Sequence, residues 1–424
     1  MGRFGLLGEK LAHSYSPEIH ARLADYEYRI YEKKREELDD FIRNGDWQGL
    51  NVTIPYKTEV IPYCDELEPE AACIGSVNTL VRRGDRTLYG ANTDAYGFRA
   101  MIQKSGITAA GKKVLVLGSG GASKTAVAVM RALSAREVIV ISRSGKDNYE
   151  NLYRHQDAEI IVNTTPVGMY PSNGKAPLSL TAFPKCCGVL DIVYNPARTA
   201  LLLQAEKLGI PYAGGLHMLV AQAKRSAELF TGQDIPNERI GEIEEELEGS
   251  MQNIILIGMP GCGKTTIARI LGRRLGRPVL DTDLFVEEKA GCSIPEIFEK
   301  FGEEFFRKLE TEVLAEVGKL SGQILATGGG CVTRDENYPL LHQNGKIVWI
   351  VRPITQLEKT GRPLSQRQDA EEMYRKRAPL YRAFSDFTAE NSETPERAAD
   401  QICAQLADAP KDRTDDQNER KKKP

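Results

Sequence analysis

The stretch Asn253-Ile-Ile-Leu-Ile-Gly-Met-Pro-Gly-Cys-Gly-Lys-Thr265 decides the fold of the last part of this chain. Its uncharged, β-rich start leads directly into the spacing G-x-x-x-x-G-K-T, and apolar residues at helical intervals follow at Ile267, Ile270, Leu271 and Leu275. Glycines in such a loop let consecutive backbone N–H groups converge on phosphate oxygens, and the amino terminus of the next helix adds positive charge. The stretch therefore predicts a strand, a phosphate-binding loop and a helix, in that order.

Outside this stretch, β-rich runs alternate with helical patterns, for example at 113–117, 137–141 and 346–350. Such alternation is typical of α/β layers with largely parallel sheets. A second glycine loop, Gly118-Ser-Gly120-Gly121, follows the run at 113–117 and opens another helical pattern. Strand, glycine loop, helix and strand in this order predict a dinucleotide-binding fold, in which Gly118, Gly120, Gly121 and Ala122 hold the cofactor.

The residues after the run 137–141 indicate which dinucleotide binds. Proteins that bind NAD usually carry an acid there for the ribose 2′-hydroxyl, whereas this chain has Ser142-Arg143-Ser144-Gly145-Lys146. Cationic side chains favour a 2′-phosphate, although an arginine after a strand can also be an ordinary surface residue. We therefore expect NADP(H), held through Ser142, Arg143, Ser144 and Lys146.

Composition bounds the class of protein. The chain has 424 residues, 41% of them hydrophobic, which predicts several globular domains. Its 56 basic and 59 acidic residues leave a net charge of -3, so we expect small-molecule substrates and neither nucleic acid nor a membrane as partner, and we leave a homo-oligomer open. Charge at Glu9 and Lys10 and the lack of long apolar runs favour the cytoplasm. Eight scattered cysteines without a C-x-x-C pair predict no structural zinc.

Several residues that follow the phosphate-binding loop at 258–263 suit phosphoryl transfer. Lys264 can neutralise phosphate charge and Thr265 can ligate magnesium. In Val279-Leu-Asp281-Thr-Asp283, a strand period of two predicts both carboxylates on one face, one near a metal and one near an acceptor hydroxyl.

Together with an F-R-K-L-E helix, a T-G-G-G loop, an R-P-L segment and a K-R-A-P-L-Y run, these motifs resemble shikimate kinase over about residues 252 to 400. The resemblance implies that Lys264 and Asp283 are catalytic and that Thr265 and Asp281 hold Mg²⁺. It implies an ATP site of Gly261, Cys262, Gly263, Lys264, Thr265, Thr266 and, on a lid, Arg362. It implies a shikimate site of Asp283, Arg307, Gly328, Gly329, Gly330 and Arg377.

The amino-terminal region carries four segments dense in hydroxyls and amides, with one lysine and one aspartate among them: Ala12–Pro17, Asn51–Lys57, Ser76–Thr79 and Gly90–Asp94. Each alone could be turn chemistry. Side chains of these kinds also suit a polyhydroxylated ring that carries a carboxylate.

In their joint order, and with Asn163–Met169, Asp191–Pro196 and Gly215–Ala223, these segments resemble shikimate dehydrogenase over residues 1 to about 248. The resemblance implies that Lys57 and Asp94 are the catalytic pair and that Gly215 contacts NADP. It implies a substrate site of Ser14, Ser16, Thr53, Lys57, Asn78, Asp94, Tyr194 and Gln222.

The two resemblances predict a bifunctional α/β enzyme of aromatic amino acid biosynthesis that reduces 3-dehydroshikimate with NADPH and then phosphorylates shikimate with ATP. The expected domains are a substrate domain at 1–94 with about 215–248, a Rossmann NADP domain at 95–214, an acidic linker at 241–251, a P-loop kinase domain with a parallel sheet at 252–408 and a disordered tail at 409–424.

Three alternatives stay open. One half could be a regulatory or binding module, or the kinase half could act on another small acceptor, such as a sugar acid or a nucleotide. Departures from the dehydrogenase pattern, among them Ser142 and His217, also leave quinate as substrate and NAD as cofactor possible.

Overall fold

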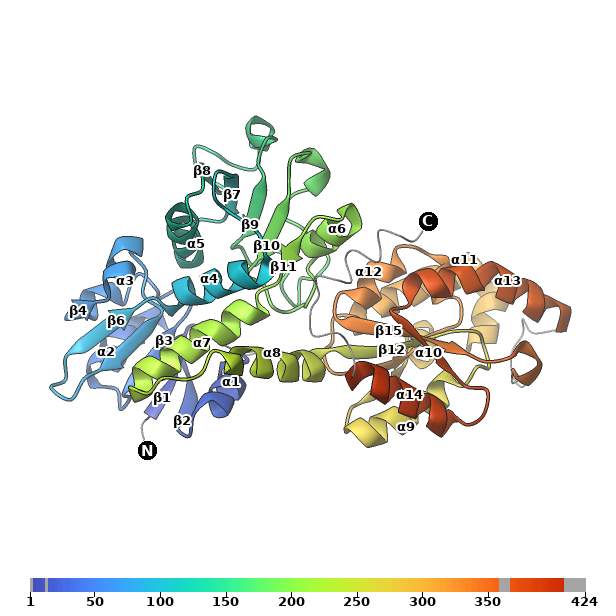
Figure 1. The fold of residues 1–424 in the computed structure, drawn as a ribbon. Helices are drawn as coiled ribbons and strands as arrows, with labels where there is room; N and C mark the ends of the chain where they lie inside the picture. The colour runs from blue at the N-terminus through green and yellow to red at the C-terminus, as the bar shows by residue number, and fades with distance from the viewer. Residues whose placement is uncertain (1–2, 12–13, 358–366, 408–424) are drawn as a thin grey trace. The chain divides into compact units, whose positions relative to one another are not determined.

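The computed structural model describes residues 3–11, 14–357 and 367–407, the last range with side chains from residue 370. The chain divides into two compact units: Met1–Tyr194 with Leu201–Leu247, and Asn195–Ala200 with Glu248–Pro424. The expected α/β class is confirmed: both units are built of helices and sheets (Figure 1). Among the described helices, none has the length and apolar character to cross a membrane.

The first unit begins with a six-stranded sheet in the order β2-β1-β3-β5-β6-β4. This sheet is mixed, because β3 pairs antiparallel with β5 and β5 antiparallel with β6, whereas the other pairs are parallel. Its elements are β1 (Arg3–Gly8), α1 (Ser16–Leu23), β2 (Glu27–Glu32), α2 (Leu38–Asn44), β3 (Gly49–Val52), β4 (Glu66–Leu67), α3 (Pro69–Ile74), β5 (Thr79–Arg82) and β6 (Leu88–Ala91).

A five-stranded sheet in the order β11-β10-β9-β7-β8 follows, and all its pairs are parallel. Every residue of β7 is buried, which suits a strand covered by helices on both faces. Its elements are α4 (Thr93–Ser105), β7 (Lys113–Leu117), α5 (Gly121–Ala132), β8 (Glu137–Ile141), β9 (Ile160–Asn163), β10 (Gly188–Asp191), α6 (Ala200–Leu208), β11 (Tyr212–Ala213), α7 (Leu216–Thr231) and α8 (Glu238–Met251).

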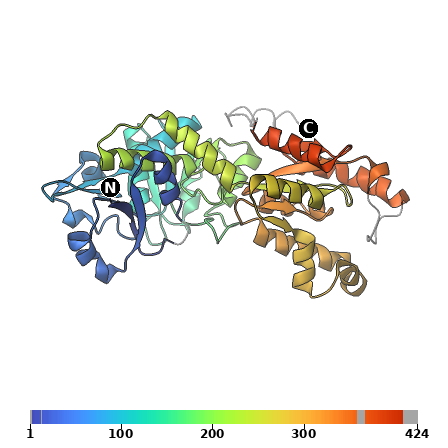
Figure 2. The same ribbon diagram turned by 90° about the horizontal axis from the view of Figure 1, so that it is seen from below.

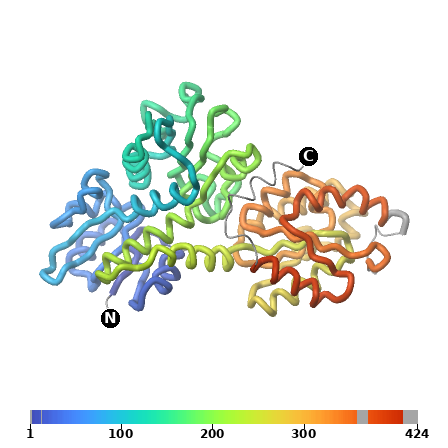
Figure 3. The backbone as a smooth tube through the Cα atoms, in the orientation of Figure 1, coloured from blue at the N-terminus to red at the C-terminus, as the bar shows by residue number. Residues whose placement is uncertain are grey.

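Helices α4 and α7 lie side by side in the first unit, although more than 100 residues of sequence separate them (Figures 1 and 3). The first turn of α4 carries Asp94, and the second turn of α7 carries Gln222. The chain thus returns after the parallel sheet and brings two predicted site residues close to the first sheet.

The second unit has a parallel sheet in the order β13-β14-β12-β15-β16. Helices cover both faces of it, with α9 and α14 packed together on one side (Figures 1 and 2). Its elements are β12 (Asn253–Ile257), α9 (Lys264–Leu275), β13 (Val279–Asp281), α10 (Thr282–Ala290), α11 (Ile294–Val317), β14 (Ile324–Ala326), α12 (Asn337–His342), β15 (Gly345–Val351), α13 (Arg367–Phe384), β16 (Phe387–Glu390) and α14 (Pro395–Ala407).

The acidic stretch 241–251, expected as a linker, forms part of helix α8, in which Ile243 and Leu247 are spaced four residues apart and are both buried. The boundary between the two units follows Leu247, inside this stretch. One local expectation needs correction. In α9, Ile267, Ile270 and Leu271 are buried as expected, but Leu275 is 40% exposed because it ends the helix. The expected tail at 409–424 lies outside the described residues.

Candidate active sites

An ion pair joins the predicted catalytic residues of the first unit. Lys57 follows β3 in a turn, and its Nζ donates to Oδ2 of Asp94 at 2.5 Å. Asn92 fixes the start of α4, because its side chain accepts from the N–H of Ala95 and donates to the carbonyl of Ser76. The side chains of Lys57 and Asp94 are only 16% and 8% exposed, so water screens their interaction weakly.

Amide and hydroxyl side chains lie beside this pair. Asn78 accepts from the N–H of Thr93 at 2.7 Å and donates to its hydroxyl at 3.0 Å, and that hydroxyl lies 3.5 Å from Oε1 of Gln222. Since Thr93 immediately precedes Asp94, the network ties three predicted substrate residues to one turn of helix. Thr93 lies in the segment Gly90–Asp94 that the sequence analysis singled out, but it was given no role there.

The other predicted substrate residues lie at two places. Ser14 accepts from the N–H of Ser16, and the ring of Tyr15 between them meets the ring of Tyr194 edge-on at 5.9 Å. Burial raises the pKa of Tyr194 above its usual value, so its hydroxyl stays protonated. Thr53 lies four residues before Lys57 and is half-buried, with its N–H bonded to the carbonyl of Leu7.

The dinucleotide loop follows β7 directly and requires glycine. Gly118 has φ +110°, and a Cβ there would lie 2.8 Å from Oγ1 of Thr164. At Gly120, which caps α5, a Cβ would meet nothing within 4 Å, so this side of the loop is open. A Cβ at Gly121 would lie 2.9 Å from the Ser76 hydroxyl and 3.3 Å from Cβ of Lys57. The loop therefore lies against Lys57.

The remaining predicted cofactor residues occupy three places. Ala122 follows Gly121 in the first turn of α5. Gly215 caps α7 so close to the backbone that a Cβ would lie 2.0 Å from the carbonyl oxygen of Ile192. Ser142 follows β8, the strand that pairs with β7. The next residues of the predicted site, Arg143, Ser144 and Lys146, are all exposed.

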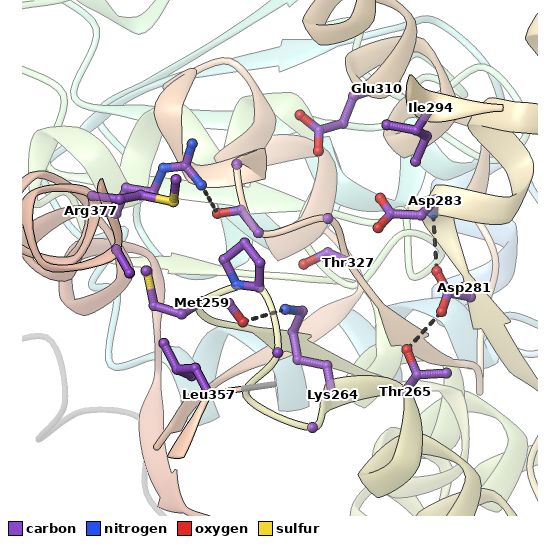
Figure 4. Close-up of a pocket in the computed structure, with 18 of the residues that line it drawn as sticks. Met259, Lys264, Thr265, Asp281, Asp283, Ile294, Glu310, Thr327, Leu357 and Arg377 are labelled. Atoms are coloured by element: carbon purple, nitrogen blue, oxygen red, sulfur yellow. Dashed lines mark hydrogen bonds between the residues drawn. The ribbon is translucent and has the colours of Figure 1, made fainter. Parts of the chain in front are cut away.

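In the second unit, the phosphate-binding loop has the backbone that its glycines allow. Gly258, Gly261 and Gly263 have φ of +145°, +82° and +98°, and α9 starts immediately after Gly263. Nζ of Lys264 donates to the carbonyls of Gly258 and Met259 at 2.9 and 3.0 Å (Figure 4). The side chain of Lys264, which is 8% exposed, thus folds back so that its ammonium group lies against the loop.

Two aspartates face the same pocket, but for a reason other than the predicted one. The strand ends at Asp281, and Asp283 lies in the first turn of α10 instead of two residues further along a strand. Asp281 caps that helix, because its Oδ1 accepts from the N–H of Asp283 at 3.1 Å, while its Oδ2 accepts from the hydroxyl of Thr265 at 2.8 Å (Figure 4). Helix capping, not strand period, brings both carboxylates to the loop.

A pocket of about 450 Å³ extends from this loop to a second glycine triplet, Gly328–Gly330, in the loop after β14. It brings together nearly all the predicted kinase residues that the structure describes: Gly261, Gly263, Lys264, Thr265, Thr266, Asp281, Asp283, Arg307, Gly328, Gly329, Gly330 and Arg377. Cys262 is fully buried behind the loop, where its carbonyl accepts from Asn391. Arg362 lies outside the described residues.

Two arginines meet the glycine triplet from different helices. Nη1 of Arg377 on α13 donates to the carbonyl of Gly329 at 3.1 Å (Figure 4). Arg307 on α11 is 7% exposed, and a Cβ on Gly330 would lie within 2.3 Å of its guanidinium. Only glycine leaves room for Arg307 in this position, so the triplet and the arginine form one surface.

Glu310 is the main residue that sequence reasoning missed. Its Oε2 accepts from Nη1 of Arg307 at 2.8 Å, and its Oε1 has no hydrogen-bond partner within the described part of the chain. Figure 4 shows its carboxylate and that of Asp283 both pointing into the pocket. Burial raises the pKa of Glu310 above its usual value although Arg307 opposes the shift. The spacing R-x-x-E on one helix could have identified it.

The comparisons with known proteins agree with this geometry. A family model described as Shikimate dehydrogenase substrate binding domain matches residues 6–80, and one described as Shikimate kinase matches residues 260–407. The chain is 34% identical over 269 residues to Shikimate dehydrogenase (NADP(+)) from Clostridium perfringens (strain 13 / Type A), covering 58% of this chain and 99% of that protein.

Solved structures match the same part of the chain. Shikimate dehydrogenase 1 from Peptoclostridium difficile is 38% identical with a TM-score of 0.55, covering 58% of this chain and 98% of that one. Shikimate 5-dehydrogenase from Thermus thermophilus, solved with NADP(H) and shikimate, is 30% identical with a TM-score of 0.53, covering 58% and 99%. The chain therefore belongs to the shikimate dehydrogenase family, and it joins that enzyme to a shikimate kinase domain in one polypeptide.

Proposed function

We propose that this chain catalyses two consecutive reactions: NADPH-dependent reduction of 3-dehydroshikimate to shikimate in the first unit, and ATP-dependent phosphorylation of the shikimate 3-hydroxyl in the second. The hydroxyl made by the first reaction is then the acceptor of the second. One observation carries the proposal: each unit holds the charged groups that its reaction needs, Lys57 with Asp94 in one and Lys264 with Asp283, Arg307 and Arg377 in the other.

The residues of both units fit the cofactors. When bound, NADPH supplies a hydride, and ATP with Mg²⁺ supplies a phosphoryl group. The open side of Gly120, the first turn of α5 and the cap of α7 at Gly215 suit a dinucleotide, and Ser142, Arg143, Ser144 and Lys146 suit its 2′-phosphate. Thr265 and Asp281 suit Mg²⁺, which takes one or two protein oxygens and completes its shell with phosphate and water.

In the reduction, Lys57 is the proton donor. Hydride addition to a carbonyl carbon leaves negative charge on the oxygen, and an ammonium group can both neutralise that charge and supply the proton. Asp94 accepts one hydrogen bond from Lys57 and so fixes the direction of the remaining N–H groups. Asn78 and Gln222, held through Thr93, orient the ring hydroxyls, and Ser14 and Ser16 bind the carboxylate.

In the phosphorylation, charge neutralisation and positioning do most of the work. Arg307 and Arg377 bind the carboxylate of shikimate, since guanidinium groups match carboxylate geometry. Asp283 accepts the proton of the attacking hydroxyl, and the Gly328–Gly330 triplet lines the ring. Lys264 leaves the loop carbonyls to neutralise charge on the transferred group.

The test is to incubate the full chain with 3-dehydroshikimate, NADPH, ATP and Mg²⁺ and to follow the products by mass spectrometry. The wild-type chain is expected to form shikimate 3-phosphate. The Lys264→Ala variant is expected to accumulate shikimate, because only the phosphorylation loses the ammonium group that neutralises charge on the transferred phosphoryl group. The Lys57→Ala variant is expected to form neither compound at a comparable rate.

Matched variants separate chemistry from folding. Lys57→Arg keeps a charge but not the compact ammonium, and Lys308→Ala removes a lysine outside the residues that line the kinase pocket. We expect Lys308→Ala to behave as wild type. A wild-type chain that stops at shikimate, or that phosphorylates another acceptor only, would contradict the proposal.

A further inference from the structure

The loop after β8 carries two exposed cationic side chains and one acidic side chain that is partly buried. Arg143 and Lys146 are exposed, whereas the side chain of Asp147, next in sequence, is 23% exposed. Two hydrogen bonds hold this arrangement: the N–H of Ser142 donates to the carbonyl of Asp147 at 3.2 Å, and the side-chain amide of Asn151 donates to the carbonyl of Lys146 at 2.9 Å. The loop therefore has a defined shape before any cofactor arrives.

His155 engages the carboxylate of Asp147. Its Nε2 lies 2.9 Å from Oδ1 of Asp147, and its side chain is 11% exposed. Because a carboxylate only accepts, Nε2 must carry the hydrogen. Nδ1 of His155 is buried without a hydrogen-bond partner among the described residues, so the contact to Asp147 is its one polar interaction there.

The position of Asp147 makes this contact informative. In dinucleotide-binding folds the acid that binds an unphosphorylated ribose 2′-hydroxyl stands at the end of the second strand, where this chain has Ser142. Asp147 is an acid five residues further along the same loop, and its charge repels a 2′-phosphate. The hydrogen bond from His155 is the largest cause of a lowered pKa of Asp147, so this carboxylate is charged near neutral pH. Left free beside Arg143 and Lys146, it would cancel much of their attraction for phosphate.

We propose that His155 is a specificity-determining positioning residue for the cofactor: its hydrogen bond keeps the Asp147 carboxylate from pairing with the cations of the loop, so that the loop selects a phosphorylated ribose. The inference rests on the proposed use of NADP(H) and adds the residue that enforces it. His155 touches no cofactor in this account and acts only through Asp147.

Binding of NADPH and NADH to the full chain, followed by nicotinamide fluorescence, tests the inference without turnover. We expect His155→Ala to weaken NADPH binding roughly three- to tenfold, the effect of one partly screened charge, and to leave NADH binding within about twofold. His155→Gln, which keeps an N–H donor near Nε2, is expected to retain the NADPH preference. The double variant His155→Ala with Asp147→Asn is expected to recover NADPH binding, because the released charge is gone.

The recovery distinguishes this role from a structural one. If His155 merely supports the fold, the double variant stays as weak as His155→Ala, or both cofactors lose affinity equally, and the proposal fails. Tyr153→Ala, on the same turn and 65% exposed, is the control and is expected to bind as wild type.

Two further outcomes are decisive. If His155→Ala does not fold, Asp147→Asn alone carries the test: it is expected to keep or strengthen NADPH binding, and weaker binding overturns the proposal. A wild-type chain that binds NADPH no better than NADH overturns the NADP assignment itself, which is a different failure from a wild-type preference that His155→Ala leaves intact.

Discussion

Replacing Gly330 by alanine should weaken substrate capture in the kinase unit. A Cβ at this position would lie 2.1 Å from Nη1 and 2.2 Å from Nη2 of Arg307. Gly330 has φ −105°, which alanine adopts without strain, so the backbone can stay as it is. The guanidinium, as the end of a flexible side chain, must move instead, and it then leaves the surface that faces the pocket.

The expected cost follows from what Arg307 binds. A charge-assisted hydrogen bond contributes about 1.5 to 3 kcal/mol, which corresponds to roughly a 10- to 150-fold rise in KM for shikimate. KM for ATP should change by less than about twofold, because the phosphate-binding loop lies on a different strand end. The melting temperature should also fall, because the displaced guanidinium leaves the carboxylate of Glu310, which is 1% exposed, without its ion-pair partner.

Steady-state kinase assays at saturating ATP, with shikimate varied, measure this effect. Gly249→Ala is the matched control: it adds the same methyl group in α8, where a Cβ meets nothing within 4 Å, and should leave both KM values unchanged. An unaltered KM for shikimate in Gly330→Ala would refute the assignment of Arg307 to the carboxylate. An unchanged melting temperature would refute the view that the methyl group displaces Arg307 from Glu310.

Two other perturbations test the first unit. Gly118→Ala should raise KM for NADPH about tenfold or more and lower the melting temperature, because φ of +110° disfavours alanine and its Cβ would lie 2.8 Å from Oγ1 of Thr164; an active, fully stable variant would show that the loop relaxes freely. Glu244→Gln should reduce the loss of stability at acid pH. Burial raises the pKa of Glu244, but His217 and Lys104 lower it by more, so the pKa lies below its usual 4.5. The ionised carboxylate therefore stabilises the fold above pH 4.5, and this contribution is lost as the pH falls through the lowered pKa. Thermal melts between pH 7 and pH 3 measure this, and equal slopes for both proteins would contradict it.

Much of the fold follows from local sequence. The β-rich runs at 113–117 and 253–257 form strands with those bounds, because a buried parallel strand is a mostly apolar run and a glycine loop ends it sharply. The run at 137–141 also forms a strand with those bounds, although only Ile141 in it is buried. The same holds for the phosphate-binding loop, whose glycines at positive φ have no substitute.

Other features depend on packing that sequence pattern does not carry. The burial of Glu310 follows from how α11 meets the second glycine triplet, which lies on a loop more than ten residues further along. The helix at 238–251 resembles a solvated acidic stretch, yet Lys104 and His217, far earlier in the sequence, satisfy Glu244 and allow it to be buried. Such partners are visible only once the chain is folded.

If both reactions occur in series, one ring receives hydride at a carbon and then a phosphoryl group on the oxygen of that same carbon. The full chain should therefore be given 3-dehydroshikimate, ATP, Mg²⁺ and NADPH deuterated at both C4 positions, and the product examined by mass spectrometry and NMR. The account predicts shikimate 3-phosphate that carries deuterium at C3, next to the phosphorylated oxygen. Deuterated shikimate without a phosphoryl group, or a phosphorylated product without deuterium, would contradict it.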